Sequence, residues 1–447
     1  MGAIAQLEHE APRAGPAEAE PDRDRWPQLL PGTELIGQAA GSGLREPPYL
    51  VRRRDGQVVQ LSRLIFVLAG SMTGEAVDVI AGRAGAALGL RITPAQVAHV
   101  AETKLAPLGL VAHRDGTVPA LRPATALLAL RFRAGVVRGR TVDALAGVLR
   151  PLFLPPILMS ALIGLVACDV WLGVTGGLTA GLRTVIGRPG LALALFGLTL
   201  LSLFFHELGH AAACRYGGAR PGRIGVGIYL VWPVFFTDVT DSYRLSKAGR
   251  LRTDLGGVYF NGLVALGAAG AYLASGYSPL LTVVATQQVL IIDQFIPWVR
   301  LDGYHIVSDL IGVSDLFTRI KPVTASLLPG RRPDRRVTEL KPWARVAVTV
   351  WVVTTILALT GMAVLVVTNA SGYLVQYWQT LIGQLHMIGD GTSSGSGVDV
   401  LSGTVGVVMV VLPIAGTTLL YLLVCRGTGR FLALHQRRAD VTLDRPG

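Results

Sequence analysis

The chain has 447 residues, of which 51% are hydrophobic and only 16% are charged. A composition this apolar argues against an ordinary soluble protein and indicates several membrane-spanning helices. The net charge of +12 would suit nucleic acid or a membrane surface, so the placement of the charges has to decide between them. The three cysteines show no CxxC spacing, which argues against a disulfide framework and against a cysteine zinc site.

A soluble front end precedes the apolar part of the chain. Residues 1–44 are rich in Pro, Ala and Glu and predict a disordered tail, not a signal peptide. Residues 45–118 read as a strand hairpin that turns at Asp55-Gly56, then three helices, the last capped by Thr93, and a second hairpin at HRDGTV. This order predicts a small cytoplasmic α+β domain of winged-helix type.

Six apolar segments follow an amphipathic linker at 119–150. Each is close to the 20 or so residues that a helix needs to cross a bilayer. They cover 152–173, 189–212, 255–276, 279–299, 344–367 and 401–425. The sequence therefore predicts a mainly α, polytopic membrane protein with its transmembrane domain at 151–425, a flexible external linker at 389–400 and a cytoplasmic tail at 426–447.

The basic residues alternate with these segments. They gather before the first span, between the second and third, between the fourth and fifth, and after the sixth. Because cytoplasmic loops collect Lys and Arg, both chain ends and both long basic loops are predicted to face the cytoplasm. Basic residues beside spans account for the net charge without a nucleic-acid-binding face, so membrane lipid is the predicted partner and nucleic acid is not.

The motif HELGH ends the second apolar segment with ionisable residues, which are costly there and usually mark a functional site. His206 and His210 lie four residues apart, so a helix brings both imidazoles to one face, where they could share a zinc ion. Glu207 follows the first histidine and is placed to take a proton from the attacking water during peptide hydrolysis. These residues predict two metal ligands and a general base.

A catalytic zinc site needs a third protein ligand. Asp302 in LDGYH is favoured, because the second and fourth spans should both end on the cytoplasmic side, and Gly303 would let the chain turn there. Asp293 lies deeper in the fourth span and is the main rival. The weaker candidates are Asp238 and Asp241, which suit a loop, and His305, which suits a supporting position.

With these motifs the chain resembles the site-2 protease superfamily of intramembrane zinc metallopeptidases. It is most similar to the bacterial branch of peptide zinc metalloproteases associated with peptide natural-product biosynthesis. The resemblance covers about 150–320 and implies that His206, His210 and Asp302 bind zinc and that Glu207 is the base. One departure is Gln294, because many members have Asn three residues before the proline that precedes LDG.

The same family has a Gly-x-x-x-Asn element on an intervening span, which GVYFN supplies here as Gly257 and Asn261. Asn261 has two interpretations. It could donate a hydrogen bond to the oxyanion or hold the substrate backbone, or it could make a helix-to-helix hydrogen bond inside the bundle.

Residues 223–239, RIGVGIYLVWPVFFTDV, are β-branched, aromatic and too irregular for a span. They predict a strand or hairpin that enters the membrane, because non-helical backbone is tolerated there only against protein or a wet cavity. Its edge could pair with an extended substrate peptide. A plain amphipathic loop is the alternative.

These features predict a zinc metalloendopeptidase of the bacterial cytoplasmic membrane whose active site opens to the cytoplasm. Its substrate would be a membrane-associated or precursor peptide, such as a ribosomally made natural product losing its leader. The 45–118 domain is similar in pattern to leader-peptide-recognition domains, with a structural appendage or DNA binding as alternatives. Two other functions stay open: a regulatory site-2 protease that cleaves a membrane signalling protein, and a non-proteolytic export, immunity or peptide-binding protein.

Overall fold

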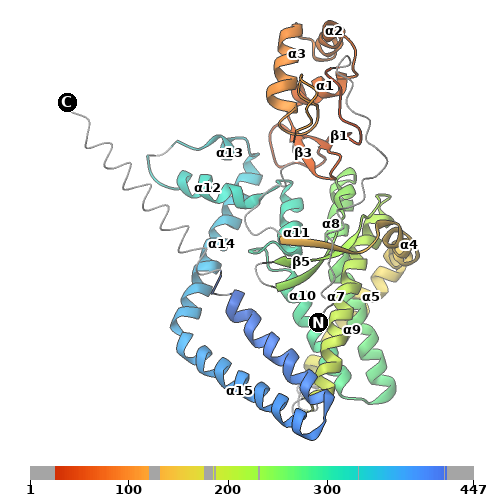
Figure 1. Ribbon diagram of the computed structural model, residues 1–447, viewed down its shortest axis with the longest axis vertical. Coiled ribbons are helices and arrows are strands. Elements are labelled where there is room, and N and C mark those ends of the chain that lie inside the picture. The colour runs from red at the N-terminus through yellow and green to blue at the C-terminus, as the bar shows by residue number, and fades with distance from the viewer. Residues whose placement is uncertain are drawn as a thin grey trace, which may run out of the picture. The chain divides into compact units, whose positions relative to one another are not determined.

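The computed structural model describes residues 26–119, 131–175, 188–229, 232–330 and 332–416, together with 185, 418 and 419. The described chain is mainly helical and divides into two compact units (Figure 1). Unit 1 comprises Met1–Ala39 and Pro48–Ala124, and unit 2 comprises Ala40–Pro47 and Thr125–Gly447. The expectation of a mainly α protein with a small N-terminal α+β part is confirmed at this level.

Unit 1 is a three-stranded antiparallel sheet, in the order β1-β2-β3, followed by three helices. Its elements are β1 Glu34–Gln38, β2 Tyr49–Arg52, β3 Val58–Leu61, α1 Arg63–Ser71, α2 Val77–Leu88 and α3 Pro94–Val100. The predicted hairpin is present, and Gly56 occupies the left-handed region at its turn with φ 84°. Thr93 caps α3 through a complete capping box. Val51, Ile80 and Val97 belong to one buried core.

Two expectations for this unit are wrong. The predicted tail boundary at residue 44 is too late, because the short run ELIGQ forms β1 and pairs with β2. The second hairpin is absent: residues 113–117 form only a turn, closed where the His113 N–H donates to the Thr117 carbonyl oxygen. The third strand of the sheet therefore comes from before the hairpin and not from after the helices. Residues 1–25 lie outside the described part of the chain.

In unit 2, the predicted amphipathic linker is wrong for residues 131–150. They form β4 Arg131–Val137 and α4 Gly139–Leu149, which are followed by the short helix Arg150–Phe153. The apolar face of α4 explains why it folds, since Val142 and Ala146 are buried in one core with α7. β4 pairs antiparallel with β5 Ile224–Tyr229, which pairs with β6 Trp232–Thr237. The hairpin expected within 223–239 is therefore confirmed.

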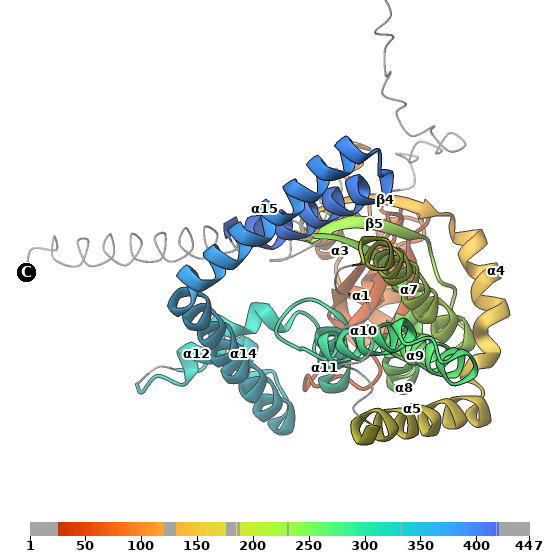
Figure 2. The same cartoon turned by 90° about the horizontal axis from the view of Figure 1, so that it is seen from below.

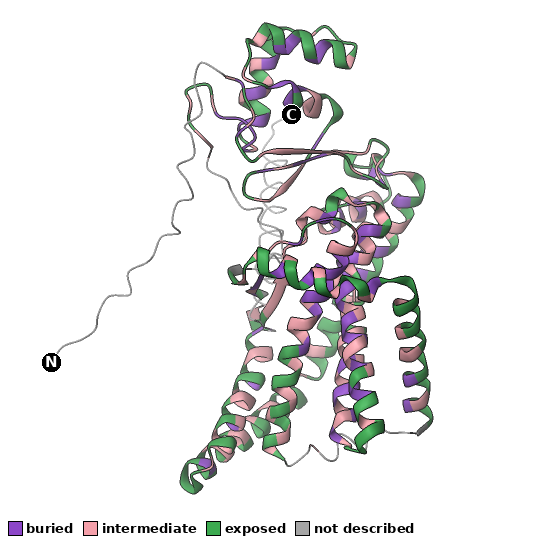
Figure 3. Cartoon of the chain, turned by 90° about the vertical axis from the view of Figure 1, so that its right-hand side faces the viewer, coloured by how far each residue is buried: buried purple, intermediate pink, exposed green. Residues whose placement is uncertain are grey.

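Five helices in the described part are long and apolar enough to cross a membrane. They are Pro155–Val174 of α5, α7 Pro189–Tyr216, α9 Gly256–Ser275, α14 Pro342–Thr368 and the helix Gly397–Gly416. Figure 3 shows that their outer faces are largely exposed. Apolar side chains such as Ile163 and Leu357, 65% and 66% exposed, lie on these faces, as expected for a surface that contacts lipid.

The predicted fourth span is shorter than expected. It is α10 Pro279–Gln294, which has 16 residues and is not among the five candidate spans. Pro297 explains the early end, because the residue before a proline is disfavoured in the helical conformation. α10 still packs against α9 through Leu281 and Val284 (Figure 2).

The flexible linker expected at 389–400 is wrong. Residues Ala370–Ser394 form α15, and the chain turns at Gly395, with φ 70°, into the helix Gly397–Gly416. These two helices lie side by side, because a Cβ on Gly403 would come within 2.7 Å of Ile388. Gly391, which belongs to the stretch that suggested a linker, lies in a close contact too, because a Cβ there would come within 2.9 Å of the Val400 backbone nitrogen. The predicted cytoplasmic tail, 426–447, lies outside the described residues.

Short helices between α9 and α14 complete unit 2. They are α11 Asp302–Ile311, the turn Leu316–Arg319, α12 Ile320–Ser326 and α13 Arg335–Thr338. Before α9 lie the turn Thr240–Arg244 and α8 Lys247–Asp254. Tyr304 of α11 and Trp351 of α14 share a buried core, so the segment around LDGYH packs against one of the five candidate membrane spans.

Candidate metal centre

Two helices cross closely at HELGH. α7 carries His206 and His210 one turn apart, and α9 begins beside them. Gly209 and Gly256 form the crossing point, because a Cβ on either one would overlap the backbone of the other. Glycine at both positions therefore lets α9 approach the histidine-bearing face of α7.

The structure brings His206, His210 and Asp302 together. The Nε2 atoms of the two histidines are 3.1 Å apart, and the Asp302 Oδ2 lies 3.1 Å from the first and 3.2 Å from the second. Both imidazoles are buried and the carboxylate is half-buried, and this group could hold a metal ion. Asp302 is the first residue of α11 and not the end of a long fourth span, but it reaches the histidines as predicted.

The hydrogen bonds around these atoms fit a bound cation. The His210 Nδ1 is 2.8 Å from the Thr253 carbonyl oxygen, which can only accept, so Nδ1 carries a proton, and once the ring is neutral Nε2 is the nitrogen with the lone pair for a metal. The Asp302 Oδ2 is buried and has no hydrogen-bond donor among the described residues. Two ligands of a tetrahedral zinc, each roughly 2.0–2.1 Å from it, lie about 3.3 Å apart. The observed separations are close to that value.

Asp302 stays ionised in this surrounding. Burial alone would raise the pKa of its carboxyl group, but the neighbouring imidazoles of His210 and His206 outweigh burial and hold the pKa well below its usual range. A carboxylate must be deprotonated to bind a metal, so the third candidate ligand is already in its binding form.

Packing fixes the segment that precedes Asp302. The Trp351 Nε1 donates to the Pro297 carbonyl oxygen at 3.0 Å, and the Arg300 guanidinium lies over the Tyr304 ring at 5.1 Å. Gly303 does not adopt the turn expected of it; it continues α11, and a Cβ there would meet the Phe295 backbone at 2.7 Å. Its function is close packing against the end of α10.

Glu207 lies on the strand side of α7. Its Oε2 accepts a hydrogen bond of 2.7 Å from the Thr237 Oγ1, and its carbonyl oxygen lies 3.0 Å from the same hydroxyl. Thr237 is the last residue of β6, so the sheet orients the carboxylate. Phe204 and Phe235 hold the two elements together with ring centroids 6.1 Å apart. No sequence signal pointed to Thr237, because the pairing depends on where the hairpin folds back.

Asn261 is fully buried on α9, and neither its Oδ1 nor its Nδ2 has a hydrogen-bond partner among the described residues. The helix-to-helix hydrogen bond considered for it is therefore absent from this part of the chain. None of the other candidate ligands belongs to the metal-ligand group of the described residues. Asp293 and His305 are exposed, Asp238 accepts from Thr240, and Asp241 accepts from Arg220 and Arg244.

Two acidic residues near the centre were not predicted. Asp254 ends α8, directly after Thr253, and interacts with Asp309 of α11. Burial, together with the charge of Asp309, raises the pKa of Asp254 to about 8. Asp309 lies two helical turns after Asp302, and that spacing was the available signal.

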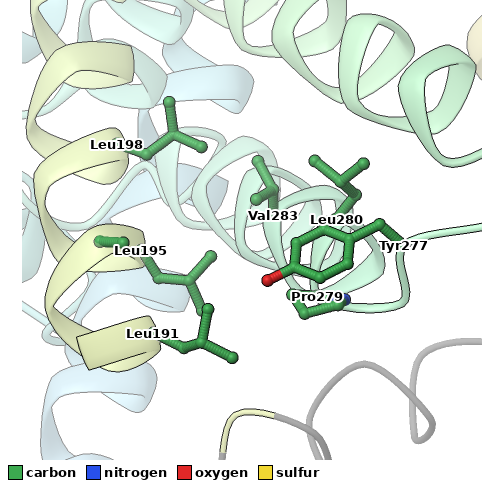
Figure 4. Close-up of a pocket in the computed structure, with 8 residues that line it drawn as sticks. Leu191, Leu195, Leu198, Tyr277, Pro279, Leu280 and Val283 are labelled. Carbon is green, nitrogen blue, oxygen red and sulfur yellow. The ribbon is translucent and has the colours of Figure 1, made fainter. Parts of the chain in front are cut away.

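A shallow apolar hollow lies beside the N-terminal half of α7. It is lined by Leu195, Leu198, Tyr277, Leu280 and Val283 (Figure 4). It is at least two helical turns before His206 and contains no charged side chain. It therefore offers no group for metal or acid–base chemistry.

Gly257 provides the closest test of the geometry. A Cβ at this position would overlap the His206 ring and lie within 2.5 Å of the His210 Nε2. We expect Gly257→Ala to weaken metal binding by at least about tenfold, since moving supporting groups of a metal site costs roughly 10–100-fold in affinity. Metal content by mass spectrometry would measure it. Gly267→Ala on the same helix, where a Cβ meets nothing within 4 Å, is the matched control; equal metal content in both variants would contradict this placement.

Comparison of the chain with known protein families, with curated proteins and with solved structures finds no match. The function therefore has to be inferred from the three convergent side chains, the glutamate beside them and the five apolar helices of the described chain.

Proposed function

We propose that the protein is an intramembrane zinc endopeptidase that hydrolyses a membrane-associated or precursor peptide. One observation supports this above all: two imidazole nitrogens and a carboxylate oxygen lie within 3.2 Å of one another beside a glutamate. His206, His210 and Asp302 would hold the zinc, which when bound supplies a Lewis acid for attack of water on a peptide carbonyl.

In the proposed reaction Glu207 is the general base. Its carboxylate accepts the proton of the attacking water and later delivers it to the leaving amine. Thr237 keeps one carboxylate oxygen hydrogen-bonded, which fixes the rotamer and leaves the other oxygen to take the proton. Asn261 is buried beside the ligand-bearing helix with its amide unpaired, so a bound substrate or oxyanion could supply its missing partner.

The substrate would bind in an extended form. β6 lies at the edge of its sheet, and no strand pairs with its outer side in the described part of the chain. The same strand ends at Thr237, next to Glu207. A peptide added to this edge would bring its backbone to the proposed base, and strand addition would expose a carbonyl that a helix conceals.

The setting is a membrane, as the five apolar helices indicate. We propose the bacterial cytoplasmic membrane, with the site open to the cytoplasm, because basic residues flank the relevant spans. Unit 1, with its small sheet and three helices, would recruit the leader part of a precursor peptide.

The experiment is zinc analysis and peptide cleavage with the full-length protein in detergent. Purified protein should contain one zinc per chain, and chelation should abolish cleavage of precursor peptides encoded by neighbouring genes. Re-addition of zinc should restore it. Protein that binds no zinc, or that cleaves equally well after chelation, would refute the proposal.

Thr237 should control turnover more than substrate binding. We expect Thr237→Val to lower kcat about tenfold or more with little change in KM, because a hydrogen bond to a charged group contributes about 1.5–3 kcal/mol. Thr237→Ser keeps the hydroxyl and should retain most activity. A Val variant as active as wild type, or a Ser variant as poor as Val, would show that the hydroxyl does not orient Glu207.

A further inference from the structure

A buried guanidinium joins three separate segments beside the metal centre. Arg250 of α8 is 5% exposed. Its Nε donates to the Asp309 Oδ1 at 3.2 Å, its Nη1 to the Leu245 carbonyl oxygen at 3.3 Å, and its Nη2 to the Ala40 carbonyl oxygen at 3.0 Å. Arginine suits this position because its planar fork presents donors in several fixed directions, which lysine cannot do.

Two of these segments support metal ligands. The last turn of α8 contains Thr253, whose carbonyl oxygen accepts from the His210 Nδ1. α11 begins with Asp302 and carries Asp309 two turns later. The ion pair between Arg250 and Asp309 therefore links the element that orients one ligand to the element that carries another.

The third segment comes from far away in the sequence. Residues 40–47, here called the strap, connect β1 to β2 of unit 1 but belong by their contacts to unit 2. The Gly43 N–H donates to the Gly312 carbonyl oxygen at 2.9 Å, and the Lys341 Nζ donates to the Ser42 carbonyl oxygen at 2.8 Å. Gly43 lies so close to α11 that a Cβ would overlap the Ile311 carbonyl oxygen. The strap thus packs on the end of the helix that starts with Asp302.

We infer that Arg250 is a positioning residue for the metal centre. By joining α8, α11 and the strap, it keeps Thr253, which orients His210, in a fixed position relative to Asp302. This inference rests on the proposed metal site but concerns a residue that touches neither metal nor substrate. The strap is continuous in the chain with β1 and β2 of unit 1. If the strap moved away from α8, the hydrogen bond between Ala40 and Arg250 would be lost.

Cobalt binding to the full-length protein in detergent would test this role. Co²⁺ replaces zinc as the probe, because its visible spectrum reports ligand geometry as well as affinity. We expect Arg250→Met to weaken Co²⁺ binding by about 10- to 100-fold and to alter the spectrum, as supporting groups of metal sites do. Arg319→Met is the matched control: Arg319 is also a buried arginine of unit 2, 8% exposed, but its side chain bonds to Glu339 and to the Arg336 carbonyl oxygen, and to no described residue of α8, α11 or the strap.

The outcomes separate this inference from the proposed function. If wild type and His210→Ala bind Co²⁺ equally, the metal site itself is wrong. If wild type binds and Arg250→Met binds as tightly with the same spectrum, or loses no more than Arg319→Met, only the inference about Arg250 is wrong. Asp309→Asn, which keeps the arginine and weakens the same ion pair, serves if Arg250→Met does not fold, and it should shift affinity in the same direction.

A substitution in the strap tests separately whether this segment affects Co²⁺ binding. Gly43→Ala should weaken Co²⁺ binding by less than Arg250→Met, because it disturbs one of three bonds. Combined with Arg250→Met it should add little, since residues that act through one network are not additive. Gly82→Ala in α2 of unit 1, where a Cβ meets nothing within 4 Å, is the control. Wild-type affinity in Gly43→Ala, or full additivity, would remove the strap from the mechanism.

Discussion

Glu207→Gln should leave the metal in place and remove nearly all peptide cleavage. The substitution keeps the size of the side chain and its place beside Thr237, but an amide cannot accept the proton of water at neutral pH. A general base contributes about 10²- to 10⁴-fold to rate, so turnover should fall by that factor. Zinc content and single-turnover cleavage, measured on one preparation, would show the two results together.

Glu339→Gln is the matched control for this variant, because it removes a carboxylate of unit 2 that pairs with Arg319 and not with the centre. It should cleave normally. If Glu207→Gln cleaves at the wild-type rate, the proposed base is wrong. If it also loses zinc, Glu207 supports the site and is not simply its base, and the division of roles would have to change.

The centre was predictable because each of its parts has a local signal. The i, i+4 spacing of His206 and His210 needs only a helix, and Asp302 followed from counting spans and reading where basic residues gather. The prediction that Asp302 lies near the histidines held although α10 is shorter than expected, because α10 still returns the chain to the end of α7 that carries His206 and His210. An error in the length of one element therefore did not affect the direction in which the chain ran.

The groups that orient these residues were not predictable in the same way. Thr237 meets Glu207 only because the β5–β6 hairpin folds back onto α7, and Arg250 finds Ala40 through a strap more than 200 residues earlier. Such contacts depend on three-dimensional packing, for which residue spacing gives no sign. The errors elsewhere have a related cause. A stretch rich in Pro, Ala and Glu suggested a tail, and a stretch rich in Gly and Ser suggested a linker, whereas β1 is held by its neighbour strand and α15 by the helix after it.

Asp302→Ala should remove the metal itself. The carboxylate oxygen is the one negatively charged member of the three, and its loss would leave two imidazole nitrogens, which seldom hold zinc firmly without a third ligand. Because loss of a mere supporting group costs roughly 10–100-fold in affinity, loss of a ligand should exceed about 100-fold. Zinc analysis after purification, and Co²⁺ titration of the chelated protein, would measure this.

Asp293→Ala is the discriminating control, because Asp293 was the rival third ligand and lies only nine residues before Asp302 in the chain. It is exposed at the end of α10 and outside the convergent group, so this variant should keep its zinc and its activity. The reverse result, zinc lost with Asp293→Ala and kept with Asp302→Ala, would place the third ligand on α10 and refute the proposed geometry. Together with Glu207→Gln, the expected results separate binding from chemistry: Asp302→Ala loses metal and turnover, and Glu207→Gln loses turnover alone.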